Sequence, residues 1–279
     1  MVNGTDLNSK NHKITSTTPL NKSIQLYKAG FSLREISKKM GIPRETLRIK
    51  LVNGGLKLRK SKRDMPIVLH EPVNKLDAKC AELLAMHAGD GCLDVTGRWS
   101  FSSNKNDQTL VNHVANLIKD VIGVVPNINV NTNRIEIRSG HRQVFNYFSK
   151  FFPIGNKTFN VNLPHEIMTS KDLDIKHCAL KGLFSTDGSF SFKKNKGLFP
   201  RIEFRVKSKK LRDQFVTLAK DFNFKFNFNT QSERKDIIYT AYIEKINEVI
   251  RWMNEISSVC DTHIKNYNHW YKLKFGGGA

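Results

Sequence analysis

The chain has 279 residues and contains 46 Lys and Arg against 25 Asp and Glu, so its formal net charge is +21 and its pI is about 9.9. This surplus indicates a phosphate-rich partner, and a DNA-binding, RNA-binding or ribosomal protein would satisfy it equally. Hydrophobic residues make up 39% of the chain, enough for a buried core, and the length allows two domains. No apolar run approaches the roughly 18 residues needed to cross a bilayer, so we expect no membrane span. The first 25 residues are polar, so we expect no signal peptide.

The four cysteines are far apart and form no CxxC pair: Cys80, Cys92, Cys178 and Cys260. Their scatter, without paired histidines, argues against a zinc site or a disulfide framework. We interpret them as reduced thiols in a reducing compartment, either the cytoplasm with its nucleoid or an organelle.

Residues 1–20 are polar and rich in Asn, Thr, Ser and Lys, so we expect a disordered tail. The next segment, residues 21–58, predicts three short helices, over 21–29, 32–40 and 43–50. Pro43 suits the first turn of the third helix, and Gly41 permits a tight turn before it. Four apolar residues would form the small core: Ile36, Met40, Ile42 and Leu47.

This spacing resembles a helix-turn-helix, in which the helix after the turn enters the major groove of DNA. The residues that would face the groove are Arg44, Glu45, Thr46, Arg48 and Lys50. Lys50 stands where an apolar residue often occurs, so Ile49 or Leu51 must complete the core. The alternative is a small helical hairpin with no nucleic-acid role.

We interpret residues 59–75 as a linker. Its first part is basic, because it contains most of the run KLRKSKR at 57–63. Lys57 and Arg59 could follow the backbone or minor groove between two DNA-binding domains. Such a charge run is equally often just solvated.

Two short stretches repeat one pattern: residues 83–91 read LLAMHAGDG and residues 180–188 read LKGLFSTDG. Each is an apolar helical run with small residues one turn apart, and each ends in Asp-Gly. The small residues are Ala85 and Gly89 in the first run and Gly182 and Thr186 in the second. They would let the two helices pack closely, and each final glycine would suit a left-handed helix end.

The aspartates are harder to explain, because a carboxylate in the last turn faces the negative end of the helix dipole. If the helices pack together, Asp90 and Asp187 repel unless a cation lies between them. This predicts a divalent-metal site. The alternative is that each Asp-Gly only starts a turn. The repeat favours the metal site, since the aspartates are 97 positions apart and the same order of elements follows each.

After each motif the sequence predicts two strands, a helix, two strands and a helix. In the first copy these lie at 92–95, 98–102, 108–121, 127–130, 134–138 and 144–151. In the second they lie at 189–193, 201–206, 211–222, 225–229, 237–243 and 246–256. We predict an α+β fold of two pseudo-symmetric αββαββα copies, 76–160 and 161–258, with helices on one face of each antiparallel sheet. The open face is free for a partner, and residues 259–279 read as a C-terminal tail.

In its two motifs, its order of elements and its repeat length, the chain resembles the single-chain LAGLIDADG homing endonucleases over residues 76–256. The second motif keeps the family's Leu180, Gly182, Leu183, Asp187 and Gly188, whereas the first keeps Leu83, Asp90 and Gly91 and has Ala85 in place of a glycine. Residues 162–171 look like the family's linker between copies. The resemblance implies a monomeric DNA endonuclease whose twin sheets saddle a long asymmetric double-stranded site.

The resemblance also implies the roles of particular residues. Asp90 and Asp187, with the preceding Gly89 and Thr186, would hold divalent ions, and Mg²⁺ suits their oxygen donors. Lys245 and Arg138, or Arg142 in place of Arg138, would polarise water or stabilise charge, and Asn104 and Ser208 would hold solvent. Basic residues on or beside the strands would contact the DNA: Arg98, Lys105, Lys193, Arg201, Arg205 and Lys207. Two alternatives remain, a transcriptional regulator that binds DNA without cutting it and a maturase that acts on intron RNA.

Overall fold

The computed structural model describes residues 19–28, 31–58, 76–193, 197–233 and 236–276. The chain divides into two compact units, Met1–Ser61 and Lys62–Ala279. The predicted tail lies outside the described residues as far as residue 18, and the predicted linker over 59–75, with Arg59, lies outside them entirely. None of the described helices combines the length and the apolar character needed to cross a membrane.

The first unit is a bundle of three helices, α1 (Pro19–Lys28), α2 (Leu33–Met40) and α3 (Arg44–Asn53). Ser32 and Glu35 form a capping box that starts α2, because each side chain accepts a hydrogen bond from the other's backbone N–H. Gly41 ends α2 at a φ of 65°, the left-handed region that the sequence led us to expect at this turn. The buried hydrophobic side chains are Tyr27, Ile36, Leu47 and Leu51, and the predicted core residues Met40 and Ile42 pack against them partly buried. Leu51 therefore completes the core, and Ile49 is exposed.

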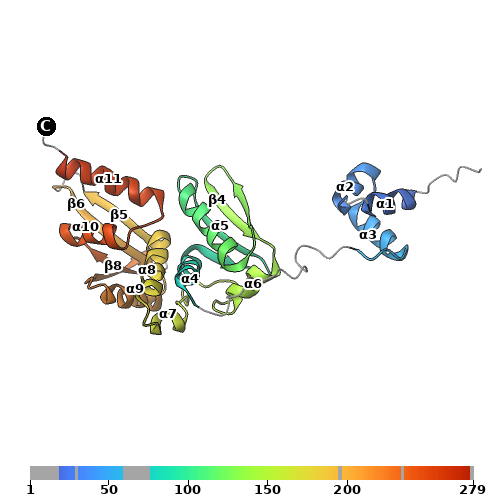
Figure 1. The fold of residues 1–279 in the computed structure, drawn as a ribbon. Helices are drawn as coiled ribbons and strands as arrows, with labels where there is room; N and C mark the ends of the chain where they lie inside the picture. Colours follow the sequence, from blue (N-terminus) through green and yellow to red (C-terminus); the bar gives the residue numbers. More distant parts are fainter. Residues whose placement is uncertain (1–18, 29–30, 59–75, 194–196, 234–235, 277–279) are drawn as a thin grey trace, which may run out of the picture. The chain divides into compact units, whose positions relative to one another are not determined.

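The second unit contains the two predicted copies in the same order of elements (Figure 1). Copy 1 comprises α4 (Ala78–Asp90), β1 (Gly91–Leu93), β2 (Trp99–Asn104), α5 (Gln108–Ile122), β3 (Asn127–Val130), β4 (Arg134–Ser139) and α6 (Arg142–Ser149). Copy 2 comprises α8 (Leu173–Asp187), β5 (Gly188–Lys193), β6 (Phe199–Val206), α9 (Lys209–Asp221), β7 (Asn227–Glu233), β8 (Asp236–Ile243) and α10 (Ile246–Glu255). A short helix, α7 (His165–Thr169), lies within the predicted linker.

The two sheets have the same antiparallel topology, with strand orders β1-β2-β4-β3 and β5-β6-β8-β7. In the first sheet Gly91 pairs with Phe101, which pairs with Ile137. In the second, Gly188 pairs with Phe204, which pairs with Ala241. Phe101 of the first sheet therefore corresponds to Phe204 of the second, and Ile137 corresponds to Ala241. Counting along the strands from these pairs gives the equivalent residues of the two sheets. The predicted α+β fold of two antiparallel sheets is confirmed.

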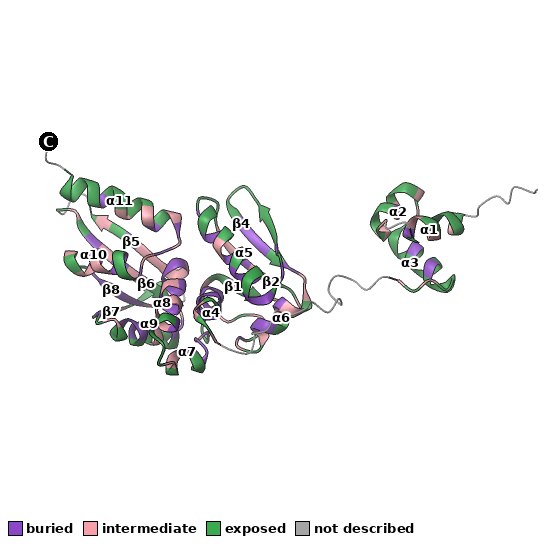
Figure 2. Ribbon diagram, viewed as in Figure 1, coloured by how far each residue is buried: buried purple, intermediate pink, exposed green. Residues whose placement is uncertain are grey.

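Each sheet has a covered face and an open face, because cross-strand partners point to the same side. Phe101 and Ile137 are buried under the helices of copy 1, and Phe204 and Ala241 under those of copy 2. The neighbouring positions on each strand point the other way and are mostly polar. Buried residues accordingly lie on one face of each sheet and where α4 meets α8 (Figure 2).

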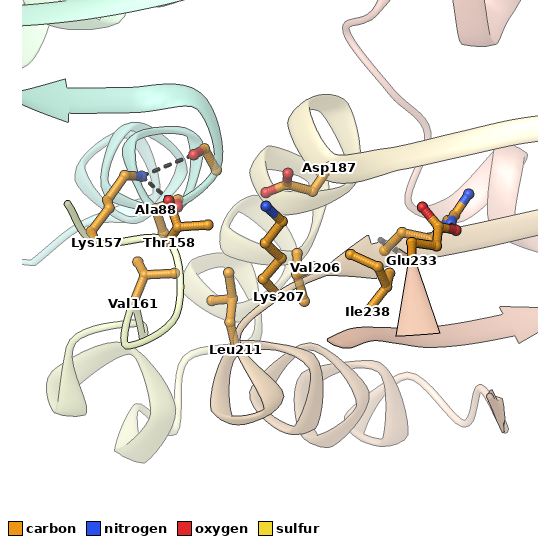
Figure 3. Close-up of a pocket in the computed structure, with 12 residues that line it drawn as sticks. Ala88, Lys157, Thr158, Val161, Asp187, Val206, Lys207, Leu211, Glu233 and Ile238 are labelled. Atoms are coloured by element: carbon orange, nitrogen blue, oxygen red, sulfur yellow. Dashed lines mark hydrogen bonds and ion pairs between the residues drawn. The ribbon is translucent and has the colours of Figure 1, made fainter. Parts of the chain in front are cut away.

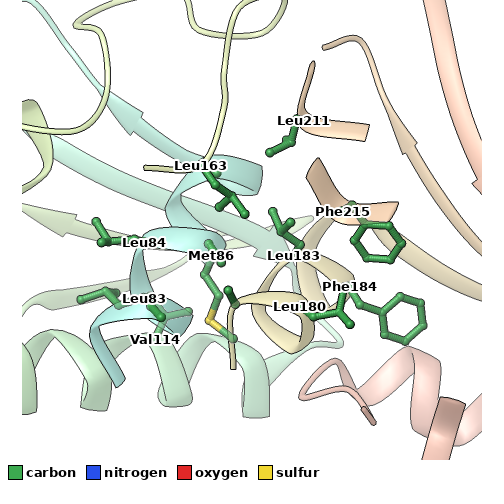
Figure 4. Close-up of a cluster of buried hydrophobic side chains, with 14 of the residues drawn as sticks. Leu83, Leu84, Met86, Val114, Leu163, Leu180, Leu183, Phe184, Leu211 and Phe215 are labelled. Carbon is green, nitrogen blue, oxygen red and sulfur yellow. The ribbon is translucent and has the colours of Figure 1, made fainter. Parts of the chain in front are cut away.

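The motif helices α4 and α8 pack against each other and join the two copies in one core. Leucines of both copies meet there, with Met86 of copy 1 and Phe184 of copy 2 beside them (Figure 4). The approach is close at Gly182, where an added Cβ would lie 2.8 Å from the Glu82 carbonyl oxygen and 3.1 Å from the Ala85 Cβ atom. This contact explains the small residues of the motifs, since a larger side chain would separate the helices.

The role predicted for the motif glycines at the helix ends was wrong. Gly91 and Gly188 have φ values of −76° and −82°, extended backbone that any residue adopts. Glycine is needed at both positions because a side chain would clash with the preceding helical turn. A Cβ at Gly91 would lie 2.1 Å from the His87 ring, and one at Gly188 would lie 2.2 Å from the Phe184 carbonyl oxygen. The chain turns from helix into strand too tightly for a side chain.

The prediction of a tail over residues 259–279 was also wrong, because Asp261–Phe275 forms a 15-residue helix, α11. This helix exchanges N-terminal caps with α5 of copy 1. The Asp107 carboxylate accepts hydrogen bonds from the Thr262 N–H at 3.2 Å and its hydroxyl at 2.6 Å. The Asp261 carboxylate accepts from the Thr109 N–H at 2.9 Å and its hydroxyl at 2.7 Å. Each aspartate thus satisfies a free N–H in the first turn of the other helix.

Candidate metal centre and nucleic-acid interface

The motif helices bring Asp90 and Asp187 to the same end of their interface. A Cβ at Gly89 would lie 2.2 Å from the Thr186 hydroxyl oxygen and 2.8 Å from the Asp187 Oδ2 atom. Only glycine therefore leaves room for the Asp187 carboxylate against the backbone of α4. Asp90 follows directly and is accessible to water, whereas Asp187 is half-buried. The Thr186 hydroxyl donates a hydrogen bond to the Leu183 carbonyl of its own helix at 3.0 Å.

Both carboxyls are harder to ionise than free ones. Burial raises the pKa of Asp187, and the nearby charge of Asp90 raises this pKa further. Desolvation by the surrounding protein also raises the pKa of Asp90, although part of the side chain is accessible to water. The charge of Lys157 opposes this shift, and the charge of Asp107 adds to it. Two carboxylates held this way are stabilised by a neighbouring cation.

Lys157 is a cation built into this centre, and the sequence did not reveal it. Its ammonium group donates to the carbonyl oxygen of His87, to that of Ala88 at 2.5 Å and to that of Gly89 at 2.9 Å. Burial lowers the pKa of Lys157 to about 8, and the charges of Asp187 and Asp90 oppose this shift. The residue lies in an irregular segment after α6, where no periodic pattern marks it.

A pocket of about 450 Å³ adjoins Asp187 and is lined by Lys157, Arg205, Lys207 and Glu233, among other residues (Figure 3). Figure 3 shows the Lys207 amine pointing toward Asp187. The same amine lies 2.5 Å from the Asp236 Oδ2 atom, so Lys207 forms an ion pair with Asp236. The sequence predicted a DNA contact for Lys207, and the structure places it beside the carboxylate.

The sequence placed Lys245 and Arg138 with the aspartates, but Lys245 lies elsewhere and Arg138 is paired with a glutamate. Lys245 is four residues beyond Ala241 of β8, on the side of that row away from Asp187, and it lines a separate hollow with Lys225. At about 3.4 Å per residue this displaces Lys245 by roughly 14 Å along the strand direction. Arg138 follows Ile137 of β4 by one position, on the side of the Gly91 row that is away from Asp90. Its guanidinium lies 2.6 Å from the Glu136 carboxylate. Arg142 begins α6, further on.

The solvent-holding role suggested for Ser208 does not fit either. Ser208 is fully buried and caps α9, accepting from the Leu211 N–H at 3.2 Å and donating to the Val161 carbonyl at 2.7 Å. By the register, Asn104 at the end of β2 matches Lys207 and not Ser208. Asn104 is exposed, and its side-chain oxygen accepts from the Asn106 N–H at 3.0 Å.

The open faces of the sheets carry several of the basic residues predicted to contact DNA. Arg201 and Arg205 lie on the open face of the second sheet, and each is oriented by glutamates. The Arg201 Nη1 atom lies 3.4 Å from Glu244 Oε1, and Arg205 contacts Glu233. The other predicted contacts are exposed at strand ends: Arg98, Lys105 and Lys193.

In the first unit, α3 presents the residues predicted to face the groove. Four basic or hydroxyl side chains are exposed on this helix, namely Arg44, Thr46, Arg48 and Lys50. The Arg48 guanidinium lies 2.6 Å from the Glu45 carboxylate. Lys57, after α3, is exposed as well.

The donor set at the motif ends fits a hard divalent ion in part. Two carboxylates and the carbonyls of the last helical turns offer only oxygen, which Mg²⁺ prefers. Among the residues that the structure describes, no cluster of three or more His, Cys, Asp or Glu side chains could hold a metal. Carbonyls, water and phosphate would have to complete the shell, and Lys157 already bonds the Gly89 carbonyl.

The model of the LAGLIDADG-like domain family matches residues 175–252, which run from α8 to α10. The protein has a LAGLIDADG fold. Its second copy is the matched LAGLIDADG-like domain, and its first copy repeats the same order of helices and strands. No curated protein sequence matches the chain.

Several solved structures are similar to the chain at low identity. The homing endonuclease I-DmoI in complex with DNA and Mn has a TM-score of 0.46 at 17% identity, covering 66% of this chain and 98% of that one. The N-terminal LAGLIDADG domain of DUF199/WhiA gives 0.45 at 19% identity, covering 70% and 87%. Full-length DUF199/WhiA from Thermatoga maritima gives 0.47 at 17% identity, covering 78% and 66%.

Proposed function

We propose that the protein is a divalent-metal-dependent endonuclease that cuts both strands of a specific DNA duplex. The pair of carboxylates at the ends of the packed motif helices supports this proposal most directly. Asp90 and Asp187 lie together and repel each other, and Asp187 lines a pocket beside the open face of the second sheet. If no cation bound there, replacing one aspartate with a neutral residue would stabilise the fold, because the repulsion would be removed.

Asp90 and Asp187 would hold the ion, with the Thr186 carbonyl and water or phosphate oxygens as further donors. When bound, Mg²⁺ would supply charge neutralisation and an activated water for phosphodiester hydrolysis. Lys157 would hold the end of α4 and keep the repulsion between the carboxylates low. Lys207, beside Asp187, would bind a phosphate oxygen or stabilise the leaving oxygen.

The open faces of the two sheets would bind the duplex, and the exposed face of α3 would add contacts in the manner of a helix-turn-helix. The net charge of +21 supports such a partner, since each phosphate neutralised releases a counterion. One chain supplies both motifs, so a monomer suffices for two scissile bonds.

The test is cleavage of linear DNA that carries the native locus, with full-length protein and Mg²⁺. We expect a double-strand break at one site that disappears with EDTA. A protein that retards this DNA in gels yet leaves both strands intact at any Mg²⁺ concentration would overturn the proposal.

A non-cleaving DNA-binding regulator is the second candidate, and Lys157 is the observation that favours it. Its ammonium group already bonds the Gly89 carbonyl and offsets the charge of both aspartates. A lysine could thus serve in place of a metal. This candidate predicts specific binding that does not depend on divalent ions.

A further inference from the structure

The edge strands of the two sheets carry the same pair of amides on their open faces. Asn127 and Asn129 lie on β3, and Asn227 and Asn229 lie on β7. The residue between each pair points to the covered face, because Ile128 pairs with Ile137 and Phe228 pairs with Ala241, and both partners are fully buried.

The register makes these asparagines true equivalents. Asn127 pairs with Arg138, and Asn227 pairs with the matching Tyr242. In the next row of the open face, Asn129 pairs with Glu136. Asn229 pairs with Thr240, the residue that matches Glu136 in the second sheet.

These amides are free to bind a ligand. Three of them are exposed and Asn229 is half-buried. Within the described residues, none of the four side chains makes a hydrogen bond to the protein. A matched set of unpaired amides in two copies with different surroundings needs an explanation other than folding.

The central strands differ in chemistry where the edge strands agree. On β2 the open-face residues are Ser100, Ser102 and Asn104, which carry no charge. The matching residues are Glu203, Arg205 and Lys207, all charged. One part of the surface is therefore symmetric between the copies, and the other is not.

We propose that the four asparagines read an inverted pair of adenine-containing elements in the DNA target, while the central strands make the rest of the target asymmetric. This inference rests on the proposed DNA binding. An asparagine amide forms two hydrogen bonds with adenine N6 and N7 in the major groove, whereas arginine prefers guanine. Alternate residues of a strand are about 6.8 Å apart, so each pair would reach adenines about two base pairs apart.

The test is selection of binding sites from a random duplex library by the full-length chain in EDTA, so that no strand is cut. We expect the enriched site to contain two adenines about two base pairs apart in each half, inverted between the halves, within an otherwise non-palindromic sequence. Asn127→Ala should reduce the preference for adenine about tenfold in one half, and Asn227→Ala should do so at the related position in the other.

Three variants serve as controls. Val130→Ala and Thr230→Ala alter the covered face of the same strands and should leave the selected site unchanged. Arg205→Ala should change base preference in one half only. An enriched site without the inverted adenines, or asparagine variants that still select it, would overturn this inference and leave DNA binding intact. No enrichment of any sequence would overturn the proposed DNA binding and this inference with it.

Discussion

Asp90 and Asp187 end their helices with a negative charge that faces the last carbonyl oxygens, an arrangement that costs free energy on its own. At the end of α4 a lysine offsets this cost, because Lys157 donates to three carbonyl oxygens of the last turn. In the last turn of α8, the Ser185 hydroxyl accepts a hydrogen bond from the Val259 N–H at 2.9 Å instead. The two halves of the centre are thus alike in their carboxylates and different in their supports.

Asp90→Asn and Asp187→Asn should each abolish double-strand cleavage and leave DNA binding within about twofold. The neutral amide keeps the volume of the side chain but loses the charge that would hold a metal. Cleavage and gel-shift assays on one substrate check this, with Asp120→Asn, an exposed aspartate on α5, as the matched control. Full double-strand cutting by either single variant would refute the metal assignment.

Lys207→Met should lower the single-turnover cleavage rate at least tenfold, because its ammonium group faces Asp187 in the pocket. Lys245→Met should leave that rate nearly unchanged, because Lys245 lines a different hollow. Rates measured at saturating protein separate chemistry from binding. If the two variants exchanged these effects, the register argument that places Lys207 in the centre would be wrong.

The sequence predicted the aspartates and missed their partners for a physical reason. Asp90 and Asp187 stand at the end of regular helices, where duplication and periodicity make a position visible. Lys157 and Asp107 act across the fold from a loop and a helix cap, and their contacts are set by tertiary packing. The prediction for Lys245 was wrong because the order of elements in a copy does not show at which end of the sheet a residue lies.

At the scale of elements, the contact of α4 with α8 joins the two copies. Gly182→Leu should destabilise the protein by ~1–3 kcal/mol or more, since an added Cβ already lies 2.8 Å from a backbone oxygen. Ala85→Gly should cost about 1 kcal/mol of helix propensity. Thermal melts of both variants measure this. A Gly182→Leu protein that melts like the wild type and still cuts DNA would show that the helices are not in close contact.

The exchange of caps predicts that α11 holds copy 1 as well as copy 2. Asp261→Ala should destabilise the protein by about 0.5–2 kcal/mol, because it leaves a Thr109 N–H without its partner. Urea unfolding gives this value, and Asp120→Ala on the surface of α5 should change little. Equal stability of the two variants would mean that the cap is not formed in solution.

Regular elements were predictable because their apolar spacing is visible in sequence, and the order of strands and helices in both copies follows that spacing. Helix α11 escaped prediction although Trp270 is fully buried in the core. Its face is defined by the aromatic side chains of β5, such as Phe190, which packs against Tyr267 and Trp270. A pattern that depends on a partner far along the chain cannot be recognised from the helix alone.

At the scale of the whole molecule, the charge is unevenly distributed. Residues 1–70 contain 15 Lys and Arg against 4 Asp and Glu, about half of the net charge in a quarter of the length. Deleting them should weaken specific DNA binding and reduce the slope of log K against log salt by about 0.9 for each phosphate that these residues neutralise. Binding isotherms over a range of salt concentrations measure the slope. An unchanged slope would show that this part of the chain does not touch DNA.

The central claim is that Asp90 and Asp187 together bind a divalent ion on the DNA-binding side of the fold. Anomalous diffraction from a crystal of the full chain with its selected duplex and Mn²⁺ tests it most directly. We predict an anomalous peak about 2.1 Å from an oxygen of each carboxylate, with Lys157 still bonded to α4. Bound DNA with no peak at either carboxylate, and with the Lys157 ammonium group between them, would contradict the claim.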